Sequence, residues 1–205
     1  MRVRNYILPA FTLLAFSSAQ ARAQTLPQAN DPAAEYNEAG HVAMDGHSLP
    51  FLIRRLPVSS FPQLPAAVAA QLNARDCLIP QTYEAHRPEN VIHASLERAG
   101  SSDWAVLCAA HGEVKLLVFF GSNPAKAMQV TSAIEVKRLQ AQGASDVLGF
   151  NWGIDPASPD QVEEAVHGST SLALDHDAIS DSVIEHQTVY HYFAKGTWTT
   201  VEARE

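Results

Sequence analysis

The chain has 205 residues, of which 46% are hydrophobic, and its 22 acidic and 14 basic side chains give a formal net charge of −8. This length and composition suit one domain with a hydrophobic core. The acidic balance argues against nucleic acid or an anionic membrane surface as a partner, because either would require a basic patch. A cation or a basic protein fits the charge better.

Residues 1–23 are predicted to be a secretory signal peptide. Two arginines precede an apolar run over residues 6–16, and small residues then lead to Ala21-Arg22-Ala23. The run is about half of the ~20 residues that a membrane-spanning helix needs, and the A-x-A ending suits cleavage before Gln24. Cleavage would remove three arginines and no acid, lowering the net charge from −8 to −11. We expect a periplasmic or extracellular protein without membrane insertion after cleavage.

Residues 24–48 show neither a helical nor a strand period and are predicted to form a flexible leader. Residues 49–205 are then expected to form a single α+β domain. It starts with a short strand over 49–53 and continues with a helix over 63–74, whose apolar stripe is Leu64, Val68 and Leu72.

The centre of the domain is predicted to be a hairpin. Strands over 104–109 and 114–120 flank a glycine-containing turn, after an earlier strand over 90–92. Both arms of the hairpin are apolar on both faces, which is typical of strands that are covered on either side. We therefore expect it to be buried at the centre of the sheet.

The C-terminal half is predicted to contain further short elements. A strand is expected over 133–139, where a helix is nearly as compatible, and another over 147–154. Ser158-Pro159-Asp160-Gln161 is typical of a helix start, and that helix is expected to stop at Gly168. A second hairpin is expected from strands over 188–193 and 197–201. Together these elements predict an α+β fold with a mainly antiparallel sheet and two or three short helices.

Cys77 and Cys108 are the only cysteines, and we predict that they form a disulfide. An exported protein matures in an oxidising compartment, and closing a loop of about 30 residues contributes about 3–4 kcal/mol to stability. The alternative is a cysteine-based active site, for which the chain lacks a C-x-x-C pair.

Several segments resemble an uncharacterised family of exported bacterial proteins. These segments are Cys77-Leu78-Ile79-Pro80-Gln81, Asn90-Val91-Ile92, Asp103-Trp104-Ala105-Val106-Leu107-Cys108, Leu117-Val118-Phe119 and Gly196-Thr197-Trp198. The resemblance covers about residues 50–202 and implies domain boundaries but no chemistry.

The segment 90–107 is also faintly similar to an integrin-type propeller repeat. Its calcium loop is missing, because only Glu97 and Asp103 stand there as strong oxygen ligands, and the chain has no second copy. Both departures argue against a propeller.

Nine acids and no lysine or arginine lie between residues 139 and 194. One interpretation is a surface for a divalent cation or a basic partner, with Asp160, Glu163 and Glu164 as partner-binding residues. The other is a solvated face that keeps an exported protein soluble. The nine acids are Asp146, Asp155, Asp160, Glu163, Glu164, Asp175, Asp177, Asp181 and Glu185.

Within this stretch Asp175, His176, Asp177 and Asp181 form a candidate metal site. Their carboxylates suit Ca²⁺ and the imidazole suits zinc. The EF-hand and H-E-x-x-H patterns are absent, however, and aspartates that cap a helix or turn explain the cluster equally well.

No enzyme class is indicated by a motif. The histidines are scattered, and Gly168-Ser169-Thr170-Ser171 lacks the second glycine of a G-x-S-x-G elbow. We therefore expect an exported, non-enzymatic domain with a binding or protective role in the cell envelope, towards a basic protein such as lysozyme. The alternative is a hydrolase or metal-dependent enzyme that uses the Asp175, His176, Asp177 and Asp181 cluster with a histidine from elsewhere.

Overall fold

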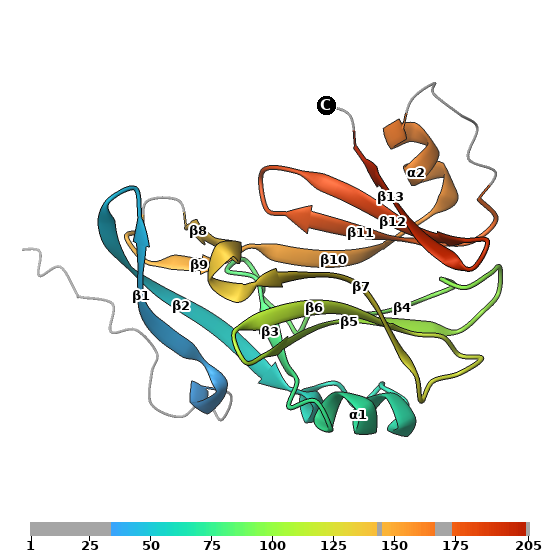
Figure 1. Cartoon of the computed structure of the whole chain (residues 1–205), viewed down its shortest axis with the longest axis horizontal. Helices are drawn as coiled ribbons and strands as arrows, with labels where there is room; N and C mark the ends of the chain where they lie inside the picture. Colours follow the sequence, from blue (N-terminus) through green and yellow to red (C-terminus); the bar gives the residue numbers. More distant parts are fainter. Residues whose placement is uncertain (1–33, 143–144, 167–173, 204–205) are drawn as a thin grey trace, which may run out of the picture. The chain divides into compact units, whose positions relative to one another are not determined.

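The computed structural model describes residues 34–142, 145–166 and 174–203 (Figure 1). The predicted signal peptide, residues 24–33 of the predicted leader and the expected helix stop at Gly168 lie outside these ranges. No helix of the described part is both long and apolar enough to cross a membrane. The described part is mostly β-sheet, with two α-helices, which is compatible with the predicted α+β class.

The larger sheet has the strand order β7-β6-β5-β3-β2-β9-β8, with β1 paired to β2 and β4 paired to β5. Its pairs are antiparallel except for β2 and β9, so the prediction of a mainly antiparallel sheet is confirmed. Its strands are β1 (Glu38–Met44), β2 (His47–Pro57), β3 (Leu78–Gln81), β4 (Val91–Ala94), β5 (Asp103–Ala110), β6 (Glu113–Phe119), β7 (Ala127–Ile134), β8 (Leu139–Ala141) and β9 (Leu148–Phe150).

The smaller sheet is an antiparallel meander of four strands in chain order. Ile154 and Ile179 of this sheet share a core with Leu107 and Leu116 of the larger one, so the two sheets pack face to face. The strands are β10 (Trp152–Ala157), β11 (Ala178–Val183), β12 (Thr188–Ala194) and β13 (Thr197–Glu202).

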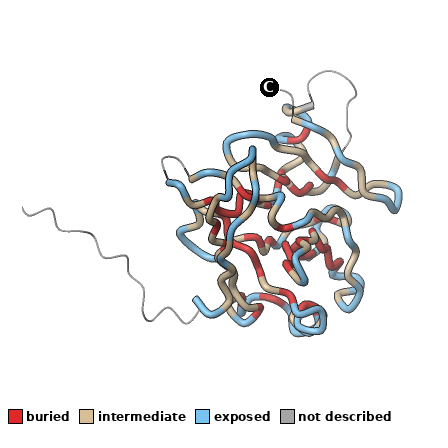
Figure 2. The backbone as a smooth tube through the Cα atoms, turned by 60° about the vertical axis from the view of Figure 1, so that its left-hand side comes forward, coloured by how far each residue is buried: buried red, intermediate tan, exposed pale blue. Residues whose placement is uncertain are grey.

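Each sheet has a helix on the face that is turned away from the other sheet (Figure 1). Helix α1 (Ala66–Asn73) buries Val68 and Leu72 against the larger sheet, as the apolar stripe predicts. Helix α2 (Pro159–Val166) buries Val162 against the smaller sheet. Buried positions accordingly concentrate in the interior strands, whereas the turns are exposed (Figure 2). Three 3₁₀ turns complete the elements: η1 (Ala34–Tyr36), η2 (Val58–Ser60) and η3 (Glu135–Arg138).

Strands β5 and β6 form the predicted hairpin. Its two-residue turn is His111-Gly112, and both residues have positive φ angles of 52° and 78°, as a type I′ turn requires. Trp104 lies opposite Phe119, and the two side chains are 9% and 0% exposed. The predicted burial of this hairpin is confirmed. The hairpin is not at the centre of the strand order, however, because β6 lies next to the edge strand β7.

The two cysteines lie at disulfide-bonding distance, with 5.0 Å between their Cα atoms. The end of α1 places Cys77, whose backbone N–H donates to the carbonyl of Leu72 at 3.1 Å. Cys108 lies on the face of β5 that α1 covers. The predicted pair therefore joins the helix to the β5–β6 hairpin.

Ordered structure begins before residue 49. Residues 38–48, which the sequence assigns to a flexible leader, form β1 and the start of β2. Strand β1 carries small and polar residues with little apolar pattern of its own. It is held instead by its full register with β2, from Glu38 opposite Ile53 to Met44 opposite His47.

Two other element boundaries also differ from prediction. The strand expected over 133–139 ends at Ile134, and η3 follows, so Glu135 and Lys137 lie in a 3₁₀ turn. The single strand expected over 147–154 is interrupted at Asn151, where the chain passes from β9 in the larger sheet to β10 in the smaller one. The sequence of a strand-like segment does not show that its two halves belong to different sheets.

Candidate functional site

The smaller sheet turns a row of three polar side chains towards the larger sheet. Asp181, His191 and Thr200 come from β11, β12 and β13. His191 lies directly opposite Thr200 of β13 and directly opposite Ile179 of β11. Asp181 is two residues after Ile179 on β11. Because side chains alternate between the faces of a sheet, all three point to the same face.

Hydrogen bonds connect the row. Nε2 of His191 lies 3.0 Å from Oδ2 of Asp181, and Nδ1 of His191 lies 2.8 Å from Oγ1 of Thr200. A carboxylate only accepts hydrogen bonds, so in the neutral imidazole Nε2–H donates to Asp181, and Nδ1 accepts from the hydroxyl of Thr200. His191 and Asp181 are 4% and 6% exposed, whereas Thr200 is exposed. The row therefore runs from a buried carboxylate to an accessible hydroxyl.

A pocket of about 310 Å³ lies beside this row, and we call it the inter-sheet pocket. It joins the three polar residues of the smaller sheet to β7 and η3 of the larger sheet. Its wall combines valine side chains with hydroxyl, amide and guanidinium groups. The lining residues are Val130, Thr131, Arg138, Asp181, Val183, Gln187, Val189, His191 and Thr200.

Arg138 supplies the positive charge of this pocket. Its guanidinium carbon lies 4.2 Å from the centre of the Trp152 ring, which is fully buried. Stacking on an indole stabilises a guanidinium and restricts its orientation. Arg138 forms no ion pair among the residues that the structure describes. The guanidinium is therefore held in place by stacking on Trp152, and no carboxylate of the described residues forms an ion pair with it.

A buried ion pair positions the turn that carries Arg138. Glu135, at the start of η3, is 1% exposed, and it accepts a hydrogen bond from Nε of Arg55 at 3.0 Å. Nη2 of Arg55 contacts both Glu135 and Glu38. Burial raises the pKa of Glu135, and Arg55 opposes that shift. This ion pair links η3 to β1 and β2.

The four predicted metal-binding residues take part in three separate contacts. Asp175 pairs with Nδ1 of His176 at 2.7 Å, and this contact lowers the pKa of Asp175. Asp177 accepts from the backbone N–H of Ser95 at 3.0 Å, and Asp181 pairs with His191. Within residues 34–142, 145–166 and 174–203, no group of three His, Cys, Asp or Glu side chains is arranged to hold a metal ion. The Ca²⁺ hypothesis gains no support from these positions.

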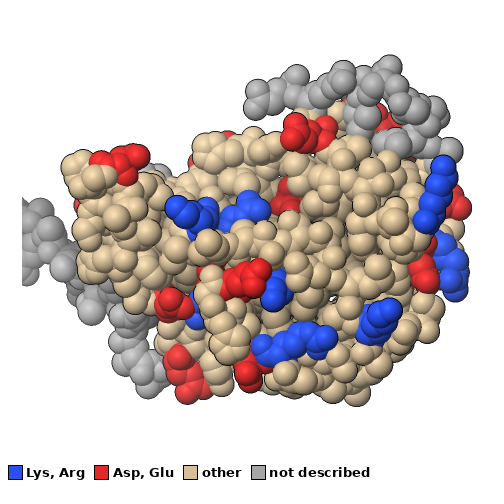
Figure 3. Space-filling model, viewed as in Figure 1, with Lys and Arg blue, Asp and Glu red and all other residues tan. Residues whose placement is uncertain are grey.

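The predicted partner-binding residues lie together on α2. Asp160, Glu163 and Glu164 are exposed, and their spacing places them on neighbouring positions of one helical face. The remaining acids of the 146–185 stretch do not all join them, because Asp177 and Asp181 are bound elsewhere. Figure 3 shows acidic and basic side chains interspersed over the face in view.

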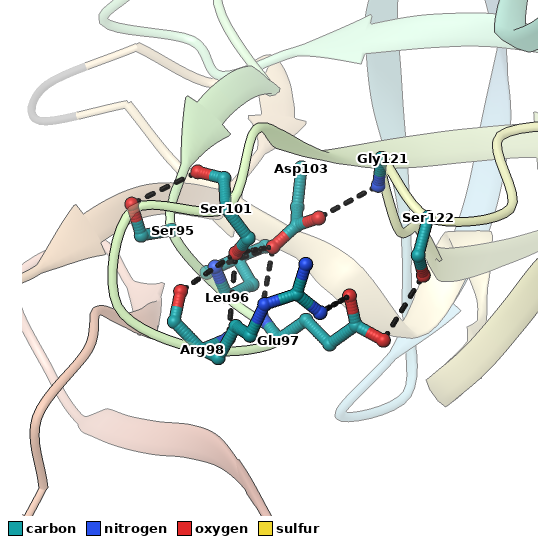
Figure 4. Close-up of polar contacts among 8 residues, drawn as sticks. All are labelled: Ser95, Leu96, Glu97, Arg98, Ser101, Asp103, Gly121 and Ser122. Atoms are coloured by element: carbon teal, nitrogen blue, oxygen red, sulfur yellow. Dashed lines mark hydrogen bonds and ion pairs between the residues drawn. The ribbon is translucent and has the colours of Figure 1, made fainter.

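Asp103, one of the two acids that stand where a propeller repeat would have its calcium loop, has a structural role (Figure 4). Its carboxylate is fully buried and accepts from the backbone N–H groups of Leu96, Glu97 and Gly121 at 2.7–2.8 Å. The hydroxyl of Ser101 contacts the same carboxylate. Asp103 thus anchors the loop after β4 to the end of β6.

A second pocket of about 420 Å³ lies on the other face of the larger sheet, beyond the end of α1. Its cations are already engaged: Lys115 pairs with Glu113 at 3.1 Å, and Arg75 donates to the side chain of Gln71 at 2.8 Å. The inter-sheet pocket is therefore the better candidate for binding a charged ligand, although it is smaller.

No family model, curated protein or solved structure matches this chain. The resemblance to exported bacterial proteins consequently stays a prediction. The candidate site rests on the geometry of its own residues.

Sequence reasoning did not identify Arg138, His191 or Thr200 as site residues. The sequence contains one signal that could have paired two of them, because a two-residue turn at Lys195-Gly196 places His191 opposite Thr200. The contributions of Asp181 and Arg138 depend on β11 and on the packing of the two sheets, for which the sequence shows no pattern.

Proposed function

We propose that this protein is an exported binding protein of the cell envelope that holds a small carboxylate in the inter-sheet pocket. The observation that carries the proposal is Arg138, a cation that is stacked on Trp152, lines the pocket and has no ion-pair partner in the described part of the chain. Its planar fork of N–H donors matches the two oxygens of a carboxylate.

The charges of the pocket favour a monoanion. Arg138 contributes one positive charge and Asp181 one negative charge to the same lining. A phosphate dianion would bring a second negative charge close to Asp181, and like charges repel strongly in a partly buried site. A carboxylate places a single charge against Arg138.

The volume and walls favour a short apolar body. About 310 Å³ is at the lower end of the range of about 300–1,000 Å³ that is typical of ligand sites. Val130, Val183 and Val189 provide apolar surface beside the charged group. Butyrate is therefore a suitable probe.

Calorimetric titration with butyrate tests this proposal. Arg138→Gln should weaken binding at least tenfold, because it removes the cation but keeps two N–H donors. The matched control is Lys137→Gln, which makes the same charge change at an exposed neighbour that does not line the pocket. Inorganic phosphate should bind more weakly than butyrate. Equal butyrate affinity in both variants, or no binding by the unmodified protein, would overturn the proposal.

A basic protein is a second candidate partner, favoured by the three exposed acids on one face of α2. Opposite charge would accelerate and orient such an encounter. Lysozyme is the probe, and the unmodified protein should inhibit it. Inhibition should be lost in the triple variant Asp160→Asn/Glu163→Gln/Glu164→Gln. The control Asp45→Asn/Asp76→Asn/Glu84→Gln removes equal charge from exposed positions outside α2. An equal loss in both triple variants would reduce this proposal to a net-charge effect.

A further inference from the structure

We propose that the inter-sheet pocket is also an acyl-transfer site, with Thr200 as nucleophile, His191 as general base and Asp181 as the positioning residue of the imidazole. The substrate class is esters of short carboxylic acids. This inference rests on the proposed function, since the carboxylate held there would be the product of such a reaction.

The register of the smaller sheet brings the base and the nucleophile together. The backbone N–H of Ala203 donates to the carbonyl of Thr188 at 3.0 Å. Hydrogen-bonded and non-hydrogen-bonded pairs alternate along an antiparallel ladder, so His191 and Thr200 form a non-hydrogen-bonded pair. Side chains are closest in such pairs, which accounts for the 2.8 Å contact between Nδ1 and Oγ1.

The hydrogen-bond polarity matches that of an activated hydroxyl. Because Nε2–H of His191 donates to Asp181, the lone pair of Nδ1 faces the hydroxyl proton of Thr200. A nucleophile, a base within hydrogen-bonding distance and a third group that orients the base are the parts that covalent acyl transfer requires. Burial keeps the base and the carboxylate in place, while Thr200 stays accessible.

The ester and water are the only reactants that this reaction needs. Oγ1 of Thr200 bonds to the ester carbonyl carbon as its proton passes to Nδ1 of His191. The carbon–oxygen bond to the alcohol then breaks, and His191 returns the proton to the departing oxygen. Water attacks the acyl-threonine with a second proton transfer through His191, which restores the hydroxyl and releases the acid. Arg138, in the same lining, would favour the negative oxygen of each tetrahedral intermediate.

The experiment combines p-nitrophenyl butyrate turnover with mass spectrometry of the intact and digested protein. The unmodified protein should gain one butyryl group, located at Thr200. Thr200→Val should abolish this adduct and turnover, and His191→Gln should slow both at least about 100-fold, the usual scale for loss of a general base. Asp181→Asn should slow acylation without weakening butyrate binding, because it removes a negative charge from the pocket lining.

The matched control is Thr199→Val, which removes a hydroxyl from the opposite face of β13 and should leave acylation unchanged. Denaturant titration checks that Thr200→Val is folded, independently of any effect on butyrate binding. An unreactive protein that still binds butyrate would overturn the acyl-transfer site but leave the proposed function intact. Loss of butyrate binding in the unmodified protein would overturn both.

Discussion

The hairpins β5–β6 and β12–β13 have the same kind of turn, but the first forms part of the core and the second lines a pocket. Each has a two-residue turn that ends in glycine, His111-Gly112 in the first and Lys195-Gly196 in the second, with positive φ at both turn residues. The first is apolar on both faces and is covered by α1 and by the smaller sheet. The second presents His191 and Thr200 towards a pocket. Local turn chemistry therefore determines that a hairpin forms, and burial determines whether its side chains stabilise the fold or build a site.

The largest effect on stability is expected at Phe119, whose side chain is fully buried in β6. Phe119→Ala should lower the free energy of unfolding by about 3–5 kcal/mol, because it leaves a cavity in the core. Thr200→Val in the second hairpin removes one hydrogen bond to His191 and should lower it by only about 1 kcal/mol. Denaturant titration checks both values. Similar losses in the two variants would contradict the assigned division between core and site.

The cysteine pair should stabilise the first hairpin and leave the second unaffected, because it connects α1 to the first hairpin only. The two cysteines are 31 residues apart in sequence. Replacing both by alanine should destabilise the protein by about 3–4 kcal/mol, the value for a closed loop of this length. Butyrate affinity measured well below the melting temperature should not change. Alkylation without reductant, followed by intact-mass measurement, should label no thiol in the folded protein; two labelled thiols would contradict the pairing.

A smaller effect is expected at Asp155 in β10. Partial burial of its carboxyl and the nearby Glu89 raise the pKa of Asp155, while Arg87 opposes the shift. The folded state therefore binds this proton more tightly than the unfolded chain does, and stability falls as pH rises through the raised pKa. Asp155→Asn should be more stable than the unmodified protein by about 0.5 kcal/mol at pH 7, since the carboxyl is only partly buried and water still screens its charge.

Melting curves of both proteins between pH 3 and pH 7 check this sign. The advantage of Asp155→Asn should disappear at pH 3, where the carboxyl is protonated in both states. An advantage that grows as pH falls would mean that Asp155 is stabilised in its charged form.

Sequence signals predict the elements in which every local preference agrees. The β5–β6 hairpin combines an apolar pattern with a glycine turn, and α2 begins with reciprocal contacts between Ser158 and Gln161, as its capping box predicts. Strand β1 was not predicted, because pairing with β2 stabilises it more than its own residues do. The break at Asn151 depends on which sheet each half of the run joins.

The site was less predictable than the fold. Asp175, His176, Asp177 and Asp181 are close in sequence, yet the sheet separates their contacts. Arg138 and Thr200 are distant in sequence and line one pocket because the two sheets pack together. Proximity along a strand says little about which side chains converge, since alternate residues face opposite ways.

The most direct test of the proposed pocket is a butyrate titration followed by NMR of backbone amides and the indole N–H groups. Saturable shift changes are expected at Arg138, Val183, Val189 and Trp152, and none around Lys115 in the second pocket. The same titration of Arg138→Gln should leave the inter-sheet signals unmoved over that concentration range. Unchanged signals at Arg138 and Val189 in the unmodified protein, or changes centred on Lys115, would contradict the claim that the inter-sheet pocket binds a carboxylate.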